Sequence, residues 1–157
     1  MKIDETDKSI LRHLQKDASL SNQDLAQRVS VSAATCLRRV QRLQSIGLLA
    51  HQITLLDPQV LRKIQPEGLT GIVEVTLDRQ GAEELRVFET HICSFTEVQQ
   101  CHQVSSGPDF VLVVYATDMQ AWQAWVQLAL TSARNIRNVR TFFSQSRAKL
   151  DLSYPLI

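Results

Sequence analysis

The chain has 157 residues, of which 44% are hydrophobic and 21% are charged, and its formal net charge is +1. These values are typical of a folded protein with one domain or two small ones, and they argue against a disordered chain or a polycation. No apolar run approaches the ~20 residues that a membrane-spanning helix needs, and the N-terminus lacks the features of a secretory signal. Three cysteines without a CxxC pair favour a reducing compartment, so we expect a cytoplasmic protein.

The first fifty residues predict three short helices. Asp4 is placed to cap a helix over about residues 5–16, and Ser21 and Ser32 each follow an apolar residue where a new helical pattern begins. Gly47 is suited to end the third helix, in which we expect the apolar residues to be buried. These apolar residues are Cys36, Leu37, Val40 and Leu43. Two capped helices joined by a tight turn predict a helix-turn-helix.

Positive charge gathers on the third helix. Residues 1–50 hold eight Lys/Arg against five Asp/Glu, whereas residues 51–157 hold nine against eleven. Steps of three and four residues place several donors on one face of the helix, and small residues at its start leave room for a phosphate. The predicted DNA-binding residues are Ser32, Ala33, Ala34, Thr35, Arg38, Arg39 and Arg42. The alternative is a solvated arginine face on a structural helix.

A hinge follows the helices. Residues 48–55 alternate enough for a strand, and residues 57–70 carry two prolines and a glycine without a clear period. We therefore expect a DNA-binding domain over residues 1–56, a linker over residues 57–70 and a second domain over residues 71–157.

The second domain reads strand, helix, strand, strand, helix, strand. The strands are expected over residues 72–77, 97–104, 110–116 and from 139 onward, and the helices over residues 82–92 and 119–130. This order predicts a four-stranded antiparallel sheet with both helices on one face, the ferredoxin-like arrangement, in a chain of the α+β class. The strand FVLVVYA (110–116) is apolar on both faces, so we expect a second copy of the chain to cover the bare face of the sheet.

At this point the chain resembles the Lrp/AsnC family of transcription regulators. The resemblance rests on TDKSILRHLQKDASLSNQDLAQRVSVSAATCLRRVQRLQSIGLL (6–49), ITLLDPQVL (53–61), VQQCHQVSSGPDFVL (98–112) and the C-terminal residues 136–141 and 149–156. It implies a protein that binds double-stranded DNA near promoters, forms homodimers that often assemble into octamers, and responds to an amino acid.

The resemblance also implies an effector site at the turn between the two middle strands. Its residues would be Ser106, Gly107 and Asp109, together with Thr141 of the last strand. Ser106 stands where the family usually has glycine, which puts the ligand contact or the turn geometry in question. The alternatives are a plain hairpin turn with a solvated Asp109 and an ordinary strand threonine.

Other chemistries are weaker. Cys101 and His102 are neighbours on a predicted strand and would point to opposite faces, so we expect no metal site. We find no nucleophile with a base, no phosphate loop and no carboxylate pair, and we predict neither a cofactor nor an enzyme. The rival interpretation is a small-molecule-binding module of amino-acid metabolism whose N-terminal helices do not bind DNA. Salt-dependent DNA binding separates the two.

Overall fold

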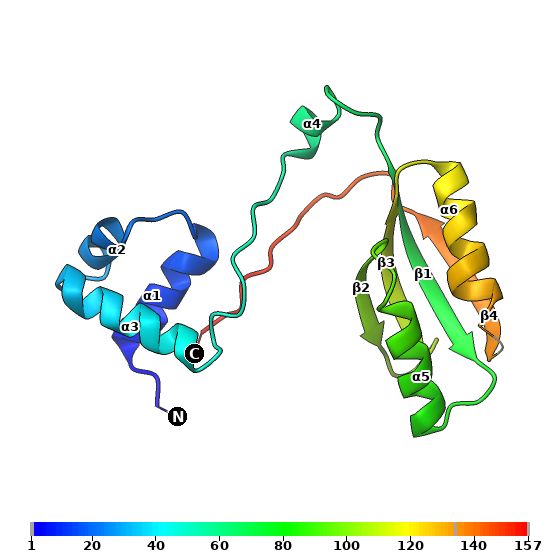
Figure 1. Cartoon of the computed structure of the whole chain (residues 1–157), viewed down its shortest axis with the longest axis horizontal. Helices are drawn as coiled ribbons and strands as arrows, with labels where there is room; N and C mark the ends of the chain where they lie inside the picture. The colour runs from blue at the N-terminus through cyan, green and yellow to red at the C-terminus, as the bar shows by residue number, and fades with distance from the viewer. Residues whose placement is uncertain (1, 134, 157) are drawn as a thin grey trace. The chain divides into compact units, whose positions relative to one another are not determined.

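A computed structural model describes residues 2–133 and 135–156 of the chain. Contacts divide the chain into two compact units (Figure 1). The first unit comprises Met1–Leu55 together with Lys149–Ile157, and the second comprises Leu56–Ala148. The C-terminal segment therefore returns to the unit in which the chain begins.

The first unit contains three helices, α1 (Glu5–Lys16), α2 (Asn22–Arg28) and α3 (Ala33–Ser45). The predicted caps are confirmed: Asp4 accepts a hydrogen bond from the Asp7 backbone, and Ser21 and Ser32 accept theirs three residues onward. Each cap satisfies a backbone N–H that the first turn of a helix leaves unpaired. Gly47 follows α3 with φ of 75°, the left-handed conformation that glycine adopts readily.

One apolar core joins the three helices. Its fully or almost fully buried members are Ile10, Leu11, Leu25, Ala26, Cys36 and Leu43. Val40 packs against this core from a partly buried position. The prediction that Leu37 is buried is wrong, because 46% of this residue is exposed on the outer side of α3.

The predicted strand over residues 48–55 is not formed. These residues have no regular secondary structure in the chain, and the next element is the single-turn helix α4 (Pro58–Leu61), capped by Asp57. A strand needs a neighbour to satisfy its backbone groups, and the alternating pattern alone cannot supply one. The linker predicted over residues 57–70 thus contains a helical turn, and the first strand already begins at Leu69.

The second unit is the predicted ferredoxin-like domain. Its strands are β1 (Leu69–Leu77), β2 (Val98–Gln103), β3 (Phe110–Ala116) and β4 (Ile136–Phe143), paired antiparallel in the order β2-β3-β1-β4. The helices are α5 (Ala82–Ile92) and α6 (Met119–Trp125), and α6 continues as a π-helix, η1 (Val126–Thr131). The prediction gave one regular helix over residues 119–130 and a later start for β4.

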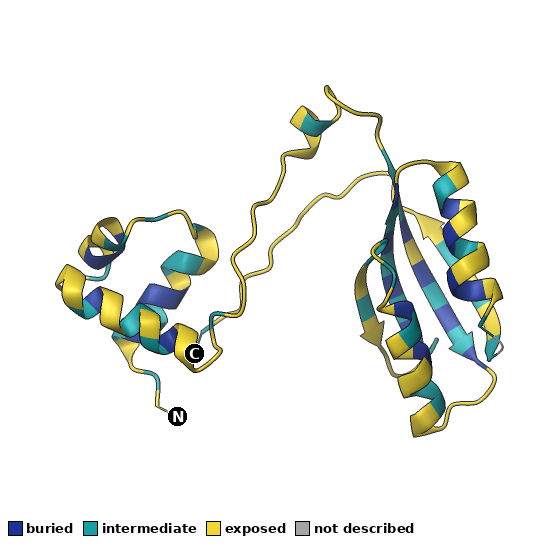
Figure 2. Cartoon of the chain, viewed as in Figure 1, coloured by how far each residue is buried: buried dark blue, intermediate teal, exposed yellow. Residues whose placement is uncertain are grey.

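Both helices pack on one face of the sheet (Figures 1 and 2). Phe88 and Ile92 of α5 share a buried cluster with Trp122 and Trp125 of α6 and with alternate residues of β1 and β3. Gly71 of β1 lies so close to the Trp122 ring that a Cβ at this position would overlap it. The close approach of helix and sheet depends on this glycine.

No helix among the described residues lies on the opposite face of the sheet. Exposed or half-buried apolar side chains point to it from three strands: Ile72, Val111, Val113, Tyr115 and Phe142. Two charged residues, Glu74 and Arg140, form an ion pair of 3.6 Å on the same face. The apolar character of FVLVVYA is thus divided between a buried helix-covered face and an uncovered one.

Candidate functional site

The start of α3 is exposed and well ordered by local hydrogen bonds. Ser32 Oγ accepts from the Thr35 backbone at 3.2 Å and donates to Thr35 Oγ1 at 2.9 Å. Asn22 donates to the Ala33 carbonyl at 2.9 Å, which ties the start of α2 to the start of α3. Ala33 and Ala34 are exposed and small. An anion can therefore approach the N-terminus of this helix closely, where the backbone dipoles favour negative charge.

Arg39 and Arg42 turn inward, towards α1. Arg39 Nη1 donates to Asp4 at 2.7 Å and to Asp7 at 2.9 Å, and Arg42 Nη2 donates to the other oxygen of Asp7. Asp7 is only 1% exposed, so its two arginine partners compensate a charge that is removed from water. The hydrogen bond from the Asp7 backbone, followed by the contact with Arg39, lowers the pKa of Asp4.

Arg38 lies on the outer side of α3 and differs from both of these arginines. It is exposed, and it forms no ion pair with any of the residues described in the structure. Leu37 and Gln41 are its exposed neighbours. The outer side of α3 therefore offers one free guanidinium, an amide and an apolar side chain.

The helical spacing predicts that Thr35, Arg38, Arg39 and Arg42 share one broad face of α3, but the structure separates the three arginines. Arg38 faces outward, whereas Arg39 and Arg42 contact α1. Gln41 was not predicted, although it follows Arg38 by three residues and shares its face. The acidic partners that turn two arginines inward are 32 to 35 positions away in the chain, so spacing within the helix did not reveal them.

The turn between β2 and β3 contains the predicted effector residues. Ser106 has φ of 66°, a left-handed conformation in which a side chain costs about 1 kcal/mol and glycine costs almost nothing. A Cβ at Gly107 would meet nothing within 4 Å, so this glycine is not required by crowding. The chain therefore keeps the backbone conformation that favours glycine but places serine there.

Asp109 connects this turn to the end of β1. Its Oδ2 accepts from the Leu77 backbone at 2.7 Å and from Gln80 Nε2 at 3.2 Å, and its own N–H donates to the Val75 carbonyl at 2.8 Å. Its carboxylate thus has a structural role as well as being a candidate ligand-binding group.

Thr141 lies elsewhere on the sheet. Thr141, on β4, pairs with Val73 of β1, whereas Asp109 bonds to Val75 and Leu77, two and four residues further along β1. At ~3.3 Å per residue this is an offset of about 7–13 Å along the strand, and β1 lies between β4 and β3, which Asp109 precedes. A single chain does not bring Thr141 and Asp109 together on one small ligand.

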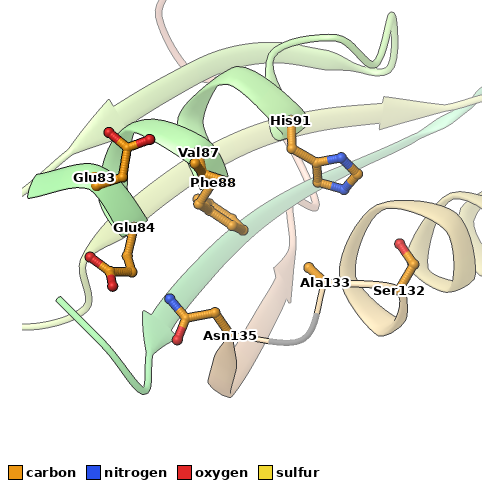
Figure 3. A pocket seen from close by; sticks show the side chains of 8 residues that line it. All are labelled: Glu83, Glu84, Val87, Phe88, His91, Ser132, Ala133 and Asn135. Atoms are coloured by element: carbon orange, nitrogen blue, oxygen red, sulfur yellow. The ribbon is translucent and has the colours of Figure 1, made fainter. Parts of the chain in front are cut away.

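A separate hollow of about 350 Å³ lies between α5 and the segment that follows η1 (Figure 3). Val87, Phe88 and Ala133 form its apolar wall, while Glu83, Glu84, His91, Ser132 and Asn135 complete its lining. His91 Nε2 lies 3.0 Å from the Ala129 carbonyl of the π-helix, which links the two walls. None of the predicted effector residues lines this hollow.

The cysteines do not form a metal site in the part of the chain that the structure describes, where no three His, Cys, Asp or Glu side chains come together. All three thiols are free. Cys36 belongs to the core, as predicted, whereas Cys101 is half-buried and Cys93 is exposed at the end of α5. No helix in residues 2–133 and 135–156 is long and apolar enough to cross a membrane.

A helix-turn-helix with a free arginine on its third helix, joined to a ferredoxin-like domain, defines a DNA-binding regulator with a sensing domain. The comparisons with known proteins agree. Residues 3–44 match the AsnC-type helix-turn-helix domain, and residues 70–153 match the Lrp/AsnC ligand binding domain. The chain belongs to the Lrp/AsnC family of transcription regulators, which are not enzymes.

Relatives with known names cover almost the whole chain. The leucine-responsive regulatory protein of Escherichia coli K12 is 33% identical over 94% of this chain and 87% of its own length. A transcriptional regulator of Neisseria meningitidis, crystallised with L-methionine, is 28% identical with a TM-score of 0.85 over 98% of this chain and 97% of its own. An AsnC family regulator from Agrobacterium tumefaciens has the same TM-score and coverage with 29% identity.

Proposed function

We propose that this chain binds promoter DNA through the outer side of α3, with Arg38 as the principal contact. The exposure of Arg38 and the lack of an acidic partner for it among the described residues carry this proposal. A free guanidinium can form two hydrogen bonds to a guanine edge or hold a phosphate. Ser32, Ala33, Ala34 and Thr35 surround the helix start, where the free N–H groups suit a phosphate.

Arg39 and Arg42 contribute differently in this proposal. Arg39 is 23% exposed and spends its Nη1 on two carboxylates, so it holds α3 against α1 rather than reading DNA. Arg42 is 41% exposed, which leaves part of its guanidinium free for the phosphate backbone beside the groove. Two such helices in a dimer would dock in successive major grooves.

The test uses a fluorescent duplex of about 30 bp, long enough for two half-sites, that wild-type protein has selected from a randomised pool. Anisotropy is measured between ~50 and ~200 mM salt. If Arg38 reads a base, Arg38→Ala should weaken the free energy of DNA binding by ~1–3 kcal/mol. If Arg38 contacts a phosphate, the variant should reduce the slope of log K against log salt concentration by about one. Arg86→Ala is the matched control, because Arg86 pairs with Glu83 on the surface of α5. Salt-independent or absent DNA binding by the wild type would instead favour the rival, a regulatory module without DNA.

We propose further that the chain forms a homodimer through the uncovered face of its sheet. Ile72 and Phe142 are 40% and 48% exposed at neighbouring positions of β1 and β4, and Val113 lies between them and the edge strand. A second copy is the partner that buries the same apolar patch on both chains. Octamers, frequent in the family, would be built from such dimers.

Sedimentation of the full chain tests the dimer. Val113→Glu should yield a monomer at micromolar concentration, because it places a charge at the centre of the interface. Leu128→Glu, on the helical side of the domain where Leu128 is 65% exposed, should leave the dimer intact. Identical behaviour of the two variants contradicts the proposed interface.

The proposed effector is an amino acid, bound by the turn of Ser106, Gly107 and Asp109 at a junction between chains. The match to the Lrp/AsnC ligand binding domain supports this ligand class, and the L-methionine complex of the Neisseria relative is one example of it. Asp109 would receive the α-ammonium group, and the turn N–H groups would receive the carboxylate. Because Thr141 and Asp109 lie on opposite sides of β1 and about 7–13 Å apart along it in the same chain, Thr141 would have to act on a ligand held by another copy.

A thermal-shift screen of the common amino acids at millimolar concentration tests the effector. A ligand that binds only the folded protein raises its melting temperature. Asp109→Asn should abolish this rise while retaining an oxygen for the Leu77 N–H, and Asp118→Asn, at the cap of α6, is the matched control. A shift that persists in Asp109→Asn overturns the assignment of this turn, and no shift with any amino acid overturns the effector class.

A further inference from the structure

The C-terminal segment packs on α1 in a defined way. Gln15 contacts the backbone of Tyr154 twice: its Oε1 accepts from the Tyr154 N–H at 2.6 Å, and its Nε2 donates to the Tyr154 carbonyl at 3.1 Å. Arg12 Nη2 donates to the Leu156 carbonyl at 3.2 Å. One face of α1 thus presents two polar side chains, one turn apart, to an extended piece of backbone.

Apolar contact accompanies these hydrogen bonds. Leu156 is partly buried and packs against the core that joins α1, α2 and α3. In contrast, the Tyr154 side chain is 80% exposed, so this residue is held by its backbone and not by its ring. The segment therefore docks through one leucine and a short stretch of main chain.

A local turn prepares the segment for docking. Asp151 Oδ1 accepts from both the N–H and the hydroxyl of Ser153. These bonds constrain the chain just before Tyr154, which reduces the conformational entropy that docking must overcome.

The helix that binds the C-terminal segment, α1, is also the helix that contacts α3. Asp4 and Asp7, at the start of α1, bind Arg39 and Arg42, while Arg12 and Gln15, nearer its end, bind the C-terminal segment. A helix of three turns moves as one body, so an added contact at one end restrains the other. The docked residues 154–156 lie outside both matched domains, which end at residues 44 and 153.

We infer that residues 154–156 are a docking segment that belongs to the DNA-binding unit and positions the recognition helix through α1. Leu156 and Gln15 are positioning residues in this inference, because they touch α1, its core or the segment and are not proposed to touch DNA. The chain passes a second time from one unit to the other between Ala148 and Lys149, after β4 and before this segment.

The test compares Leu156→Asp with Leu152→Asp in the full chain. Leu152 is 55% exposed and outside the core, so it is the matched control. Leu156→Asp should speed hydrogen exchange of the α1 and α3 amides, and it should weaken binding of the selected duplex by about 5- to 150-fold, the usual range of coupling between sites. The salt slope should not change, because no phosphate contact is lost. Leu156→Met, which remains apolar, should bind as the wild type does.

Gln15→Ala provides a second variant that preserves a good helix former and removes only the two bonds to Tyr154. It should shift exchange and affinity in the same direction as Leu156→Asp. Equal exchange and affinity for Leu156→Asp and Leu152→Asp overturn the inference, and so does a reduced salt slope, which would mean that the segment itself contacts DNA. If the wild type bound no DNA, the proposed function would fail, while hydrogen exchange would still decide whether the segment restrains α1.

Discussion

Replacing Asp7 by asparagine tests whether the contact between α1 and α3 supports the DNA-binding unit. The carboxylate is 1% exposed and accepts from two guanidinium groups, and it also accepts from the Asp4 N–H at 3.2 Å. Asparagine has nearly the same shape. It offers one acceptor, however, and its NH₂ group faces a guanidinium that can only donate.

The expected loss follows from these contacts. A hydrogen bond to a charged group contributes about 1.5–3 kcal/mol; one of the two bonds is lost, and the other then joins a guanidinium to a neutral amide oxygen instead of to a carboxylate. Arg42 is 41% exposed and can turn to water, and Arg39 keeps Asp4, so we expect the lower part of the sum, about 2–3 kcal/mol. In a domain of roughly 60–100 residues each kcal/mol lowers Tm by ~4–8 °C, which gives a decrease of about 10–20 °C.

The chain contains its own reference for this measurement. Both tryptophans, Trp122 and Trp125, lie in the second unit, so their fluorescence reports the melting of that unit alone. Asp7→Asn should lower the midpoint temperature at which the first unit loses its helical circular-dichroism signal. It should leave the midpoint temperature of the tryptophan fluorescence unchanged. Asp24→Asn is the matched control, since Asp24 occupies the same third position of α2 but is exposed. If the two variants melt alike, the reasoning about the α1–α3 contact is refuted.

Three further outcomes are expected. Ser106→Gly should raise the free energy of unfolding of the second unit by roughly 1 kcal/mol, because glycine relieves the strain of the positive φ of 66°. Tryptophan fluorescence in urea measures this change, and Gly107→Ala should alter the stability little. A lower stability of Ser106→Gly would contradict the strain at this position. Iodoacetamide at mildly alkaline pH should modify Cys93 well before Cys101, because burial, followed by the neighbouring Cys93, raises the pKa of Cys101 to about 12; equal modification by mass spectrometry speaks against this. The pKa of Asp4 is lowered in the folded chain, so the ionised Asp4 stabilises the first unit fully above the ordinary pKa of 3.8. This stabilisation is lost as the pH falls through the lower pKa of the folded chain. Asp4→Asn should therefore make the melting temperature of the first unit less sensitive to acid in that range.

The helices and most strands could be predicted from the sequence because their signals are local. Asp4, Ser21 and Ser32 each accept a hydrogen bond from the backbone three residues onward. The starts of α1, α2 and α3 can therefore be predicted from residues that are close together in the sequence. The order of strands and helices along the sequence likewise predicted the ferredoxin-like domain. The family usually has glycine at the position of Ser106, and this pointed to the positive φ that the structure shows there.

Contacts between distant parts of the chain were decided only by the tertiary structure. Arg38 and Arg39 are adjacent and chemically identical, yet one is free and the other is held by Asp4 and Asp7 of another helix. The alternation of residues 48–55 formed no strand because a ladder requires a partner that the pattern does not contain. The docking of Leu156 on α1 joins residues 144 positions apart, and loop closure over that distance depends on the geometry of everything between them. Local hydrogen bonds thus follow from neighbouring residues, whereas the acidic partners of Arg39 and the docking site of Leu156 follow from the folded arrangement.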